Sequence, residues 1–184
     1  PASLPLAMAK LLPAGRSHDE ERHALLERYT SQANDQVAAQ LKSANVWMSV
    51  RRFDRVVRHA QRAQALDAGH PGALLLEAQG REAQGDVKRA ELARRRVRAC
   101  ASSELRCAVA LGEDELRSVG PGRALNRLEP WLKRDGVALS PDFHRVRYWA
   151  ARSLARERPR VLEATLRSWL AVCPSYKRRR TLED

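Results

Sequence analysis

The chain has 184 residues, enough for one ordinary domain or a short array of repeats. No apolar stretch approaches the roughly 20 residues that span a membrane, and three cysteines exclude a disulfide-dense scaffold. The net charge of +12 favours an acidic partner: nucleic acid, anionic lipid or an acidic protein. The basic residues are 29 Arg and 5 Lys, an imbalance that GC-rich coding also produces without selection for a ligand.

The composition predicts helices. The chain has only nine Gly and nine Pro against abundant Ala, Leu, Arg and Glu, which are good helix formers. It has few β-branched residues and no alternating apolar pattern of the kind found in strands. We therefore predict an all-α fold.

Two segments precede the main pattern. Residues 1–16 are apolar but contain prolines at positions 1, 5 and 13, so we expect an extended segment there. Residues 17–34 are expected to form a capping helix that begins at a capping box of Ser17 and Glu20.

A similar pattern then recurs four times, in 51–71, 85–103, 120–136 and 159–174. Equivalent apolar positions are Val56, Ala90, Ala124 and Leu162, which are separated by 34, 34 and 38 residues. Another helical stretch precedes each copy, and these stretches are 35–49, 73–83, 105–118 and 143–156.

A pair of helices every 34 residues, with the sequence QGD at an inner turn, resembles the tetratricopeptide repeat family. Small residues of the first helices and the apolar residues of the second helices match the family pattern, as does Pro174 at the end. The resemblance implies a right-handed superhelical array of antiparallel helix pairs, with about four repeats over 35–176 and the N-terminal helix before them. The remaining residues, 177–184, form a basic tail that we expect to fray.

Two residues depart from the pattern. Pro130 falls inside an expected helix, where it lacks an amide hydrogen and clashes with the preceding turn, so we predict a kink or an early stop. Arg94 occupies a position that the family fills with an apolar side chain. We expect its stem to lie along the seam or its guanidinium to pair with a carboxylate, with Glu91 and Glu77 as candidates.

The sequence contains no recognisable catalytic or metal-binding pattern. It lacks a phosphate-binding loop, a nucleophile elbow and a His-Glu-x-x-His motif, and its five histidines are scattered. The segment GPGR (120–123) falls where the repeat requires a turn. We predict no enzyme activity, no cofactor and no metal. The four tryptophans fall on or beside apolar positions of the repeats, so we expect them to be buried.

Two interpretations of the cysteines remain open. Cys100 and Cys107 would end one repeat and begin the next. A disulfide between them would fix the turn and imply an oxidising compartment. Alternatively, both are small buried thiols in a reduced cytoplasm. Cys173 is a lone thiol in either case.

The resemblance also implies a binding surface, because in this family the first helices line a concave groove that holds an extended peptide or a helix. The groove positions carry polar groups and arginines, which suit an acidic or C-terminal peptide. They are Asn45, Met48, Gln79, Glu82, Arg106, Glu113, Arg117, His144, Arg147 and Tyr148.

We therefore expect a non-enzymatic module that binds a partner protein, as an assembly, secretion or cell-envelope scaffold of a bacterium, in its cytoplasm or periplasm. The alternative is a helical-repeat protein that binds nucleic acid through basic outer faces, such as the arginine-rich segment 84–98.

Overall fold

The structure is a computed structural model that describes residues 3–134 and 140–172. Within these residues it is all-helical, which confirms the predicted fold class. No helix in the described part is long and apolar enough to cross a membrane. Ten α-helices follow one another along the chain: α1 (Leu4–Leu11), α2 (Asp19–Gln32), α3 (Gln36–Ser49), α4 (Phe53–Leu66), α5 (Pro71–Ala83), α6 (Val87–Cys100), α7 (Leu105–Ser118), α8 (Pro121–Leu128), α9 (Pro141–Ser153) and α10 (Pro159–Val172).

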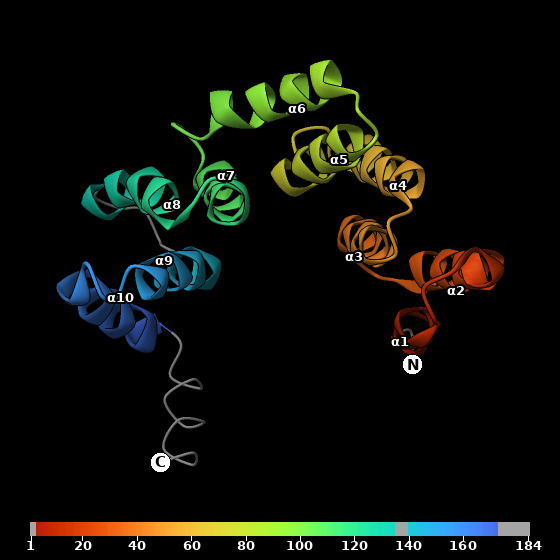
Figure 1. The fold of residues 1–184 in the computed structure, drawn as a ribbon, viewed down its shortest axis with the longest axis horizontal. Helices are drawn as coiled ribbons and strands as arrows, with labels where there is room; N and C mark the ends of the chain where they lie inside the picture. Colours follow the sequence, from red (N-terminus) through yellow and green to blue (C-terminus); the bar gives the residue numbers. More distant parts are fainter. Residues whose placement is uncertain (1–2, 135–139, 173–184) are drawn as a thin grey trace, which may run out of the picture. The chain divides into compact units, whose positions relative to one another are not determined.

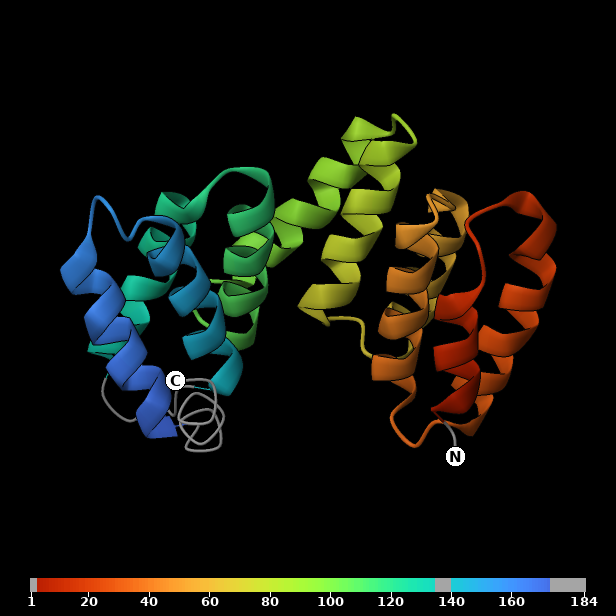
Figure 2. The same ribbon diagram turned by 60° about the horizontal axis from the view of Figure 1, so that its bottom comes forward.

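The chain divides into two compact units, which we describe separately: unit 1 is Pro1–Val97 and unit 2 is Arg98–Asp184. In unit 1, α1, α3 and α5 form one layer, and α2 and α4 pack against it as a second layer (Figures 1 and 2). The core between these layers includes Leu26, Trp47 and Val56, all fully buried. Helix α6 joins through a small cluster in which Ala90 and Ala93 contact Ala78 of α5.

Short local signals set the helix ends in unit 1. The Asp35 carboxylate accepts a hydrogen bond from the Ala38 amide, which caps α3. The turn between α5 and α6 contains Gly85 at a φ of 83°, a left-handed conformation that glycine adopts without a steric penalty. The turn therefore falls at the QGD sequence, as the repeat pattern predicts.

In unit 2, α7 and α9 form one layer, and α8 and α10 pack against it as a second layer (Figure 1). The core includes Ala124, Leu125, Ala150 and Ala151. Helix α8 ends at Leu128, two residues before Pro130, and continues only as a 3-10 helix over Glu129–Lys133. The predicted early stop at this proline is thus found.

The N-terminal part differs from the expectation. The segment predicted to be extended contains α1. Pro5 does not prevent this helix, because it lies in the first helical turn, where a backbone amide has no hydrogen-bond partner within the helix. The capping box is also wrong: α2 begins at Asp19, and Ser17 lies in a preceding 3-10 helix over Arg16–His18. The basic tail 177–184 lies outside the described residues.

Candidate partner-binding surfaces

Four of the predicted groove residues lie in unit 1, on two helices that contact each other. Asn45 is exposed on α3 and donates to the Leu41 carbonyl oxygen at 3.1 Å, whereas Met48 is half-buried against the core. On α5, Gln79 is half-buried and Glu82 is exposed. Because α3 and α5 belong to the same layer, these residues belong to adjacent helices of one face of the fold.

Arg94 forms an ion pair that crosses between helices of unit 1. Its Nη2 donates to the Glu82 carboxylate of α5, a partner that the sequence did not indicate. The Arg94 side chain is only 16% exposed, so its aliphatic stem lies along the seam between α5 and α6. Its guanidinium reaches the Glu82 carboxylate, which is about half exposed. The hydrogen bond from Arg94 lowers the pKa of Glu82 below its usual value.

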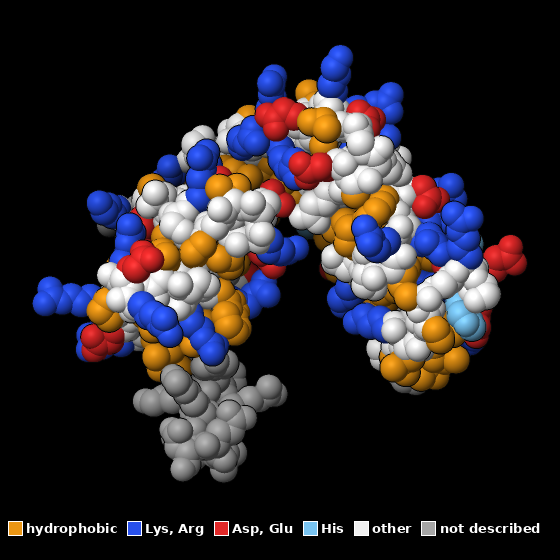
Figure 3. All heavy atoms as spheres, viewed as in Figure 1, with side chains coloured by type: hydrophobic (Ala, Val, Ile, Leu, Met, Phe, Trp, Pro, Cys, Tyr) orange, Lys and Arg blue, Asp and Glu red, His pale blue; other side chains and the backbone are white. Residues whose placement is uncertain are grey.

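The first helix presents an exposed apolar stripe that sequence reasoning missed. Leu4, Met8 and Leu11 are 54%, 45% and 83% exposed, while Leu6 and Ala9 of the same helix are buried in the core. The spacing of the three residues, four and then three, places them on one side of α1. Hydrophobic side chains gather at this end of unit 1 in Figure 3. The same spacing could have revealed the stripe, had 1–16 been expected to be helical.

Three predicted groove residues in unit 2 lie on the exposed side of α7. Arg106 donates to Glu104 at 2.9 Å, and Arg117 pairs with Glu113 at 2.8 Å, one turn earlier on the helix. All of these charges are at least one third exposed. They are therefore accessible, although each arginine already has a carboxylate partner within the unit.

The other three predicted groove residues in unit 2 are buried, which corrects their assignment to an exposed surface. His144 and Tyr148 are 2% and 6% exposed, and Arg147 is 6% exposed and pairs with Glu129 at 3.1 Å. The His144 Nδ1 atom lies 3.0 Å from the Ser168 hydroxyl. Burial, with a smaller effect from Arg147, lowers the pKa of His144.

The tryptophan of α9 is exposed instead. Trp149 is 45% exposed, so the expectation that all four tryptophans are buried is wrong at this position. Trp47, Trp131 and Trp169 are buried, as predicted. The guanidinium of Arg152 lies over the Trp149 ring, 5.1 Å from its centroid.

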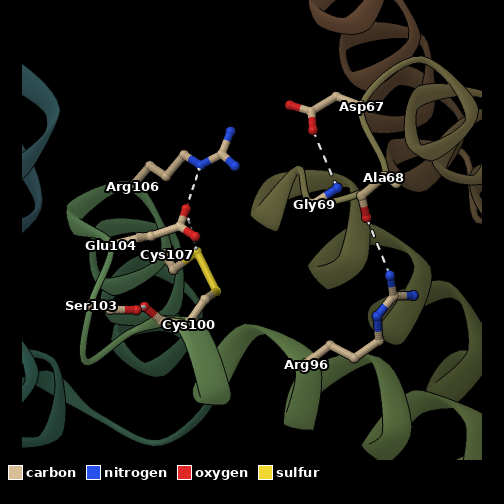
Figure 4. Close-up of a disulfide and its surroundings, with 9 residues drawn as sticks. All are labelled: Asp67, Ala68, Gly69, Arg96, Cys100, Ser103, Glu104, Arg106 and Cys107. Atoms are coloured by element: carbon tan, nitrogen blue, oxygen red, sulfur yellow. Dashed lines mark hydrogen bonds and ion pairs between the residues drawn. A yellow bond between two sulfur atoms is a disulfide. The ribbon is translucent and has the colours of Figure 1, made fainter.

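A disulfide joins Cys100 at the end of α6 to Cys107 in the first turn of α7, with 5.9 Å between their Cα atoms (Figure 4). Of the two interpretations left open by the sequence, the structure has the bridged one. The bridged turn also carries backbone hydrogen bonds: the amides of Ser103 and Glu104 donate to the Cys100 carbonyl oxygen at 3.1 and 2.8 Å. Cys173 lies outside the described residues.

A pocket on α8 is lined by two arginines that share one carboxylate partner. Arg123, Asn126 and Arg127 line it. The carboxylate of Glu115, 8% exposed, accepts from Arg127 at 3.0 Å and lies 3.8 Å from Arg123. Among the described residues, no group of three or more His, Cys, Asp or Glu side chains could hold a metal ion.

Comparisons with known proteins do not assign this chain to a family. No protein-family model matches it, and neither curated proteins nor solved structures give a significant match.

On the face drawn in Figure 3, Lys and Arg side chains lie over most of the visible helices, and Asp and Glu side chains lie between them. Many arginines of the described residues have specific carboxylate partners, as the ion pairs of Arg94, Arg117 and Arg147 illustrate. The high positive charge alone therefore does not mark one binding face.

Proposed function

We propose that the chain is a non-enzymatic protein-binding module that holds a peptide or helix of a partner protein. In this proposal its helix pairs form a right-handed array like that of tetratricopeptide repeats, and the partner lies along the layer of first helices. The observation that carries the proposal is the exposed apolar stripe of α1, formed by Leu4, Met8 and Leu11. Exposed apolar patches on folded proteins commonly mark interaction sites.

The gain on covering this stripe is large enough to support binding. Fully burying one exposed leucine or methionine side chain contributes about 1.5–3 kcal/mol, and covering Leu4, Met8 and Leu11, which are 54%, 45% and 83% exposed, gives about half to four fifths of that for each. Three such side chains on one helix give a partner helix or extended segment a continuous apolar contact. Because α1 contacts α3 within the same layer, the partner can continue from α1 onto α3 and α5.

The remaining groove residues of unit 1 supply polar contacts to the same partner. Asn45 and Glu82 are exposed and Gln79 is half-buried, and in this proposal a partner shares the Glu82 carboxylate with Arg94 and adds hydrogen bonds to the amides. The positive charge of the whole chain favours a partner with acidic groups or a free C-terminal carboxylate. We propose that this activity serves a bacterial assembly, secretion or cell-envelope scaffold.

The test is a comparison of variants in affinity capture from a lysate of the host, with bound proteins measured by quantitative mass spectrometry. The double variant Met8→Glu, Leu11→Glu places two charges in the stripe and should lose the specific partners by tenfold or more. The matched control is Leu66→Glu, because Leu66 is 51% exposed but lies at the end of α4, in the other layer. The proposal fails if both proteins retain the same partners, or lose them equally, while circular dichroism shows both to be folded.

The alternative function, nucleic-acid binding through basic outer surfaces, has its strongest support on α9, at the exposed side chain of Trp149.

A further inference from the structure

The exposed indole of Trp149 is held in place by an aromatic chain that leads into unit 2. Tyr148 contacts Trp149 edge to face, with ring centroids 5.6 Å apart, and Trp169 of α10 at 4.8 Å. Tyr148 and Trp169 are both buried, whereas Trp149 is 45% exposed. The Trp149 ring therefore rests on a packed support, and little side-chain freedom is lost when a ligand covers it.

Arginines surround this ring on the solvent side. Arg145 lies one turn before Trp149 and Arg152 one turn after it, so the three share one face of α9. The guanidinium of Arg152 lies over the ring at 5.1 Å. The planar guanidinium and the indole together present a stacking surface that carries a positive charge.

The same positive charge continues through the turn that follows α9. Arg156 and Arg158 in this turn and Arg160 in the first turn of α10 are all exposed, and Glu157 is the acid among them. The exposed residues of 141–160 include five arginines against two acids, a net charge of +3, since Arg147 is buried and paired with Glu129. One of its acids, Asp142, is already paired with Arg145 at 3.1 Å.

We propose that this face of unit 2, formed by Trp149, Arg152 and the three arginines that follow α9, binds single-stranded nucleic acid. An unstacked base lies on the Trp149–Arg152 pair, and successive phosphates contact Arg156, Arg158 and Arg160. This activity goes beyond the proposed function, because it uses α9 and the α9–α10 turn of unit 2 and does not involve the α1 stripe of unit 1.

The chemistry of the face favours nucleic acid over a protein partner. Tryptophan and arginine are both enriched in protein–protein interfaces, so the net charge of the face decides, because nucleic-acid interfaces are much more positive than protein–protein interfaces. Here the exposed neighbours of Trp149 along its face are Arg145, Arg152 and the uncharged Ser153, and none of them is acidic. A phosphate chain neutralises such a cluster at every nucleotide, and each base offers a ring for stacking.

The exposed indole also favours a single strand over a duplex. In a duplex the faces of the bases are covered by their neighbours, so a surface ring finds no base to stack on. A duplex would use the arginines alone. Stacking on a tryptophan contributes to affinity only when bases are unpaired and splayed.

The experiment measures the binding of fluorescein-labelled dT20 and rU20 to the purified chain by fluorescence anisotropy, with circular dichroism as the check of folding. The variant Trp149→Ala should weaken both affinities by about 5- to 150-fold, the range measured for loss of one stacked base. Trp149→Phe, which keeps an aromatic ring against Tyr148, should lose less. The matched control Leu92→Ala, at a 61% exposed position of α6, should bind like the unmodified chain.

The contribution of the arginines to binding is measured separately, by the salt dependence of the affinity. The double variant Arg156→Gln, Arg158→Gln should reduce the slope of log K against log salt concentration by about 1.4, because each phosphate contact on a single strand contributes about 0.7. The charge-matched control Arg95→Gln, on α6 with its side chain 73% exposed, should leave the slope unchanged.

Two further probes separate stacking from charge and from peptide binding. Heparin is a polyanion without bases, so its affinity should depend on the arginines but not on Trp149. The proposal is overturned if Trp149→Ala binds dT20 and rU20 as tightly as the unmodified chain. It is equally overturned if neither oligonucleotide binds while poly-glutamate binds in a Trp149-dependent way, because the face would then be a site for acidic peptides.

Discussion

The guanidinium of Arg22 on α2 lies over the ring of Trp47 on α3, 5.7 Å from its centroid, and both side chains are fully buried. The same guanidinium donates to the carbonyl oxygens of Ala9, Leu12 and Pro13 at 3.3, 3.0 and 2.8 Å. The last carbonyls of a helix have no partner within the helix and carry partial negative charge. Arg22 therefore caps the C-terminal end of α1 and fixes that helix to the core.

We predict that Arg22→Met lowers the free energy of unfolding by about 3 kcal/mol, because it removes the donor of the buried bond to Ala9 and of the partly buried bonds to Leu12 and Pro13, and it breaks the ion pair with Asp19. Urea unfolding followed by circular dichroism measures the change. Arg28→Met is the control on the same helix, since Arg28 is exposed, and should change stability by no more than about 0.5 kcal/mol. Equal losses in the two variants would show that Arg22 does not fix α1.

The capping of α1 by Arg22 explains why the sequence predicted most of the helices but not α1. The periodic apolar positions of 35–176 predicted the helices of both units closely, because a 3.6-residue period repeated over many turns is a strong signal. Helix α1 was missed because it is only eight residues long and carries Pro5, and short helices depend on tertiary contacts. Its main contact, Arg22, lies 13 residues from Ala9 in sequence and carries no local signal.

The site residues of α9 show a second limit of sequence reasoning. The predicted surface residues His144, Arg147 and Tyr148 are buried, whereas Trp149, expected in the core, is exposed. One residue along a helix corresponds to a rotation of about 100°, so a small error in register exchanges the buried and exposed faces. An arginine or histidine is ordinarily exposed, and only the nearby Glu129 and Ser168 explain why Arg147 and His144 are buried here.

The close approach of α5 to α4 at Gly80 makes a further prediction. A Cβ atom at this position would lie 2.8 Å from Val57 Cγ2 and 3.3 Å from Val56 Cγ1. Both valines are stiff at χ1 and buried, so they have little room to move. Gly80→Ala should therefore destabilise the protein by about 1–2 kcal/mol, although alanine gains about 1 kcal/mol in helix propensity.

Gly122→Ala is the comparison for this prediction. Gly122 lies in α8, and a Cβ atom added there would have no neighbour within 4 Å, so alanine should be neutral or stabilising by up to about 1 kcal/mol. Thermal unfolding of the two variants gives the sign of each change. The packing argument is wrong if Gly80→Ala melts at or above the temperature of the unmodified protein.

The Cys100–Cys107 disulfide should stabilise the turn between α6 and α7. The bond closes a loop with a sequence separation of seven, and loop entropy for so short a loop corresponds to about 2–3 kcal/mol. Adding a reductant should therefore lower the melting temperature of the unmodified chain. The double variant Cys100→Ser, Cys107→Ser should melt at this lower temperature with or without reductant. If the reductant still lowers the melting temperature of the double variant, the effect does not come from this disulfide.

His59 gives the chain a defined response to acid. The ring is 1% exposed and its Nδ1 atom lies 2.7 Å from the Gln40 side-chain oxygen. Burial, assisted by the positive charge of Arg62, lowers the pKa of His59 from 6.5 to about 4. Between these two values the unfolded chain binds a proton at this histidine and the folded chain does not. Stability is therefore complete above pH 6.5 and is lost as the pH falls towards 4.

We predict a loss of about 3 kcal/mol from this group between pH 7 and pH 4, measured as the free energy of unfolding in urea at several pH values. His59→Gln removes the titrating ring, so its stability should be lower at pH 7 but should fall less steeply over the same range. The lowered pKa values of His23 and His144 act in the same direction, which leaves a residual slope in the variant. Parallel pH profiles for the two proteins would show that His59 is not the group responsible, because only a group that titrates differently in the folded and unfolded states changes the slope.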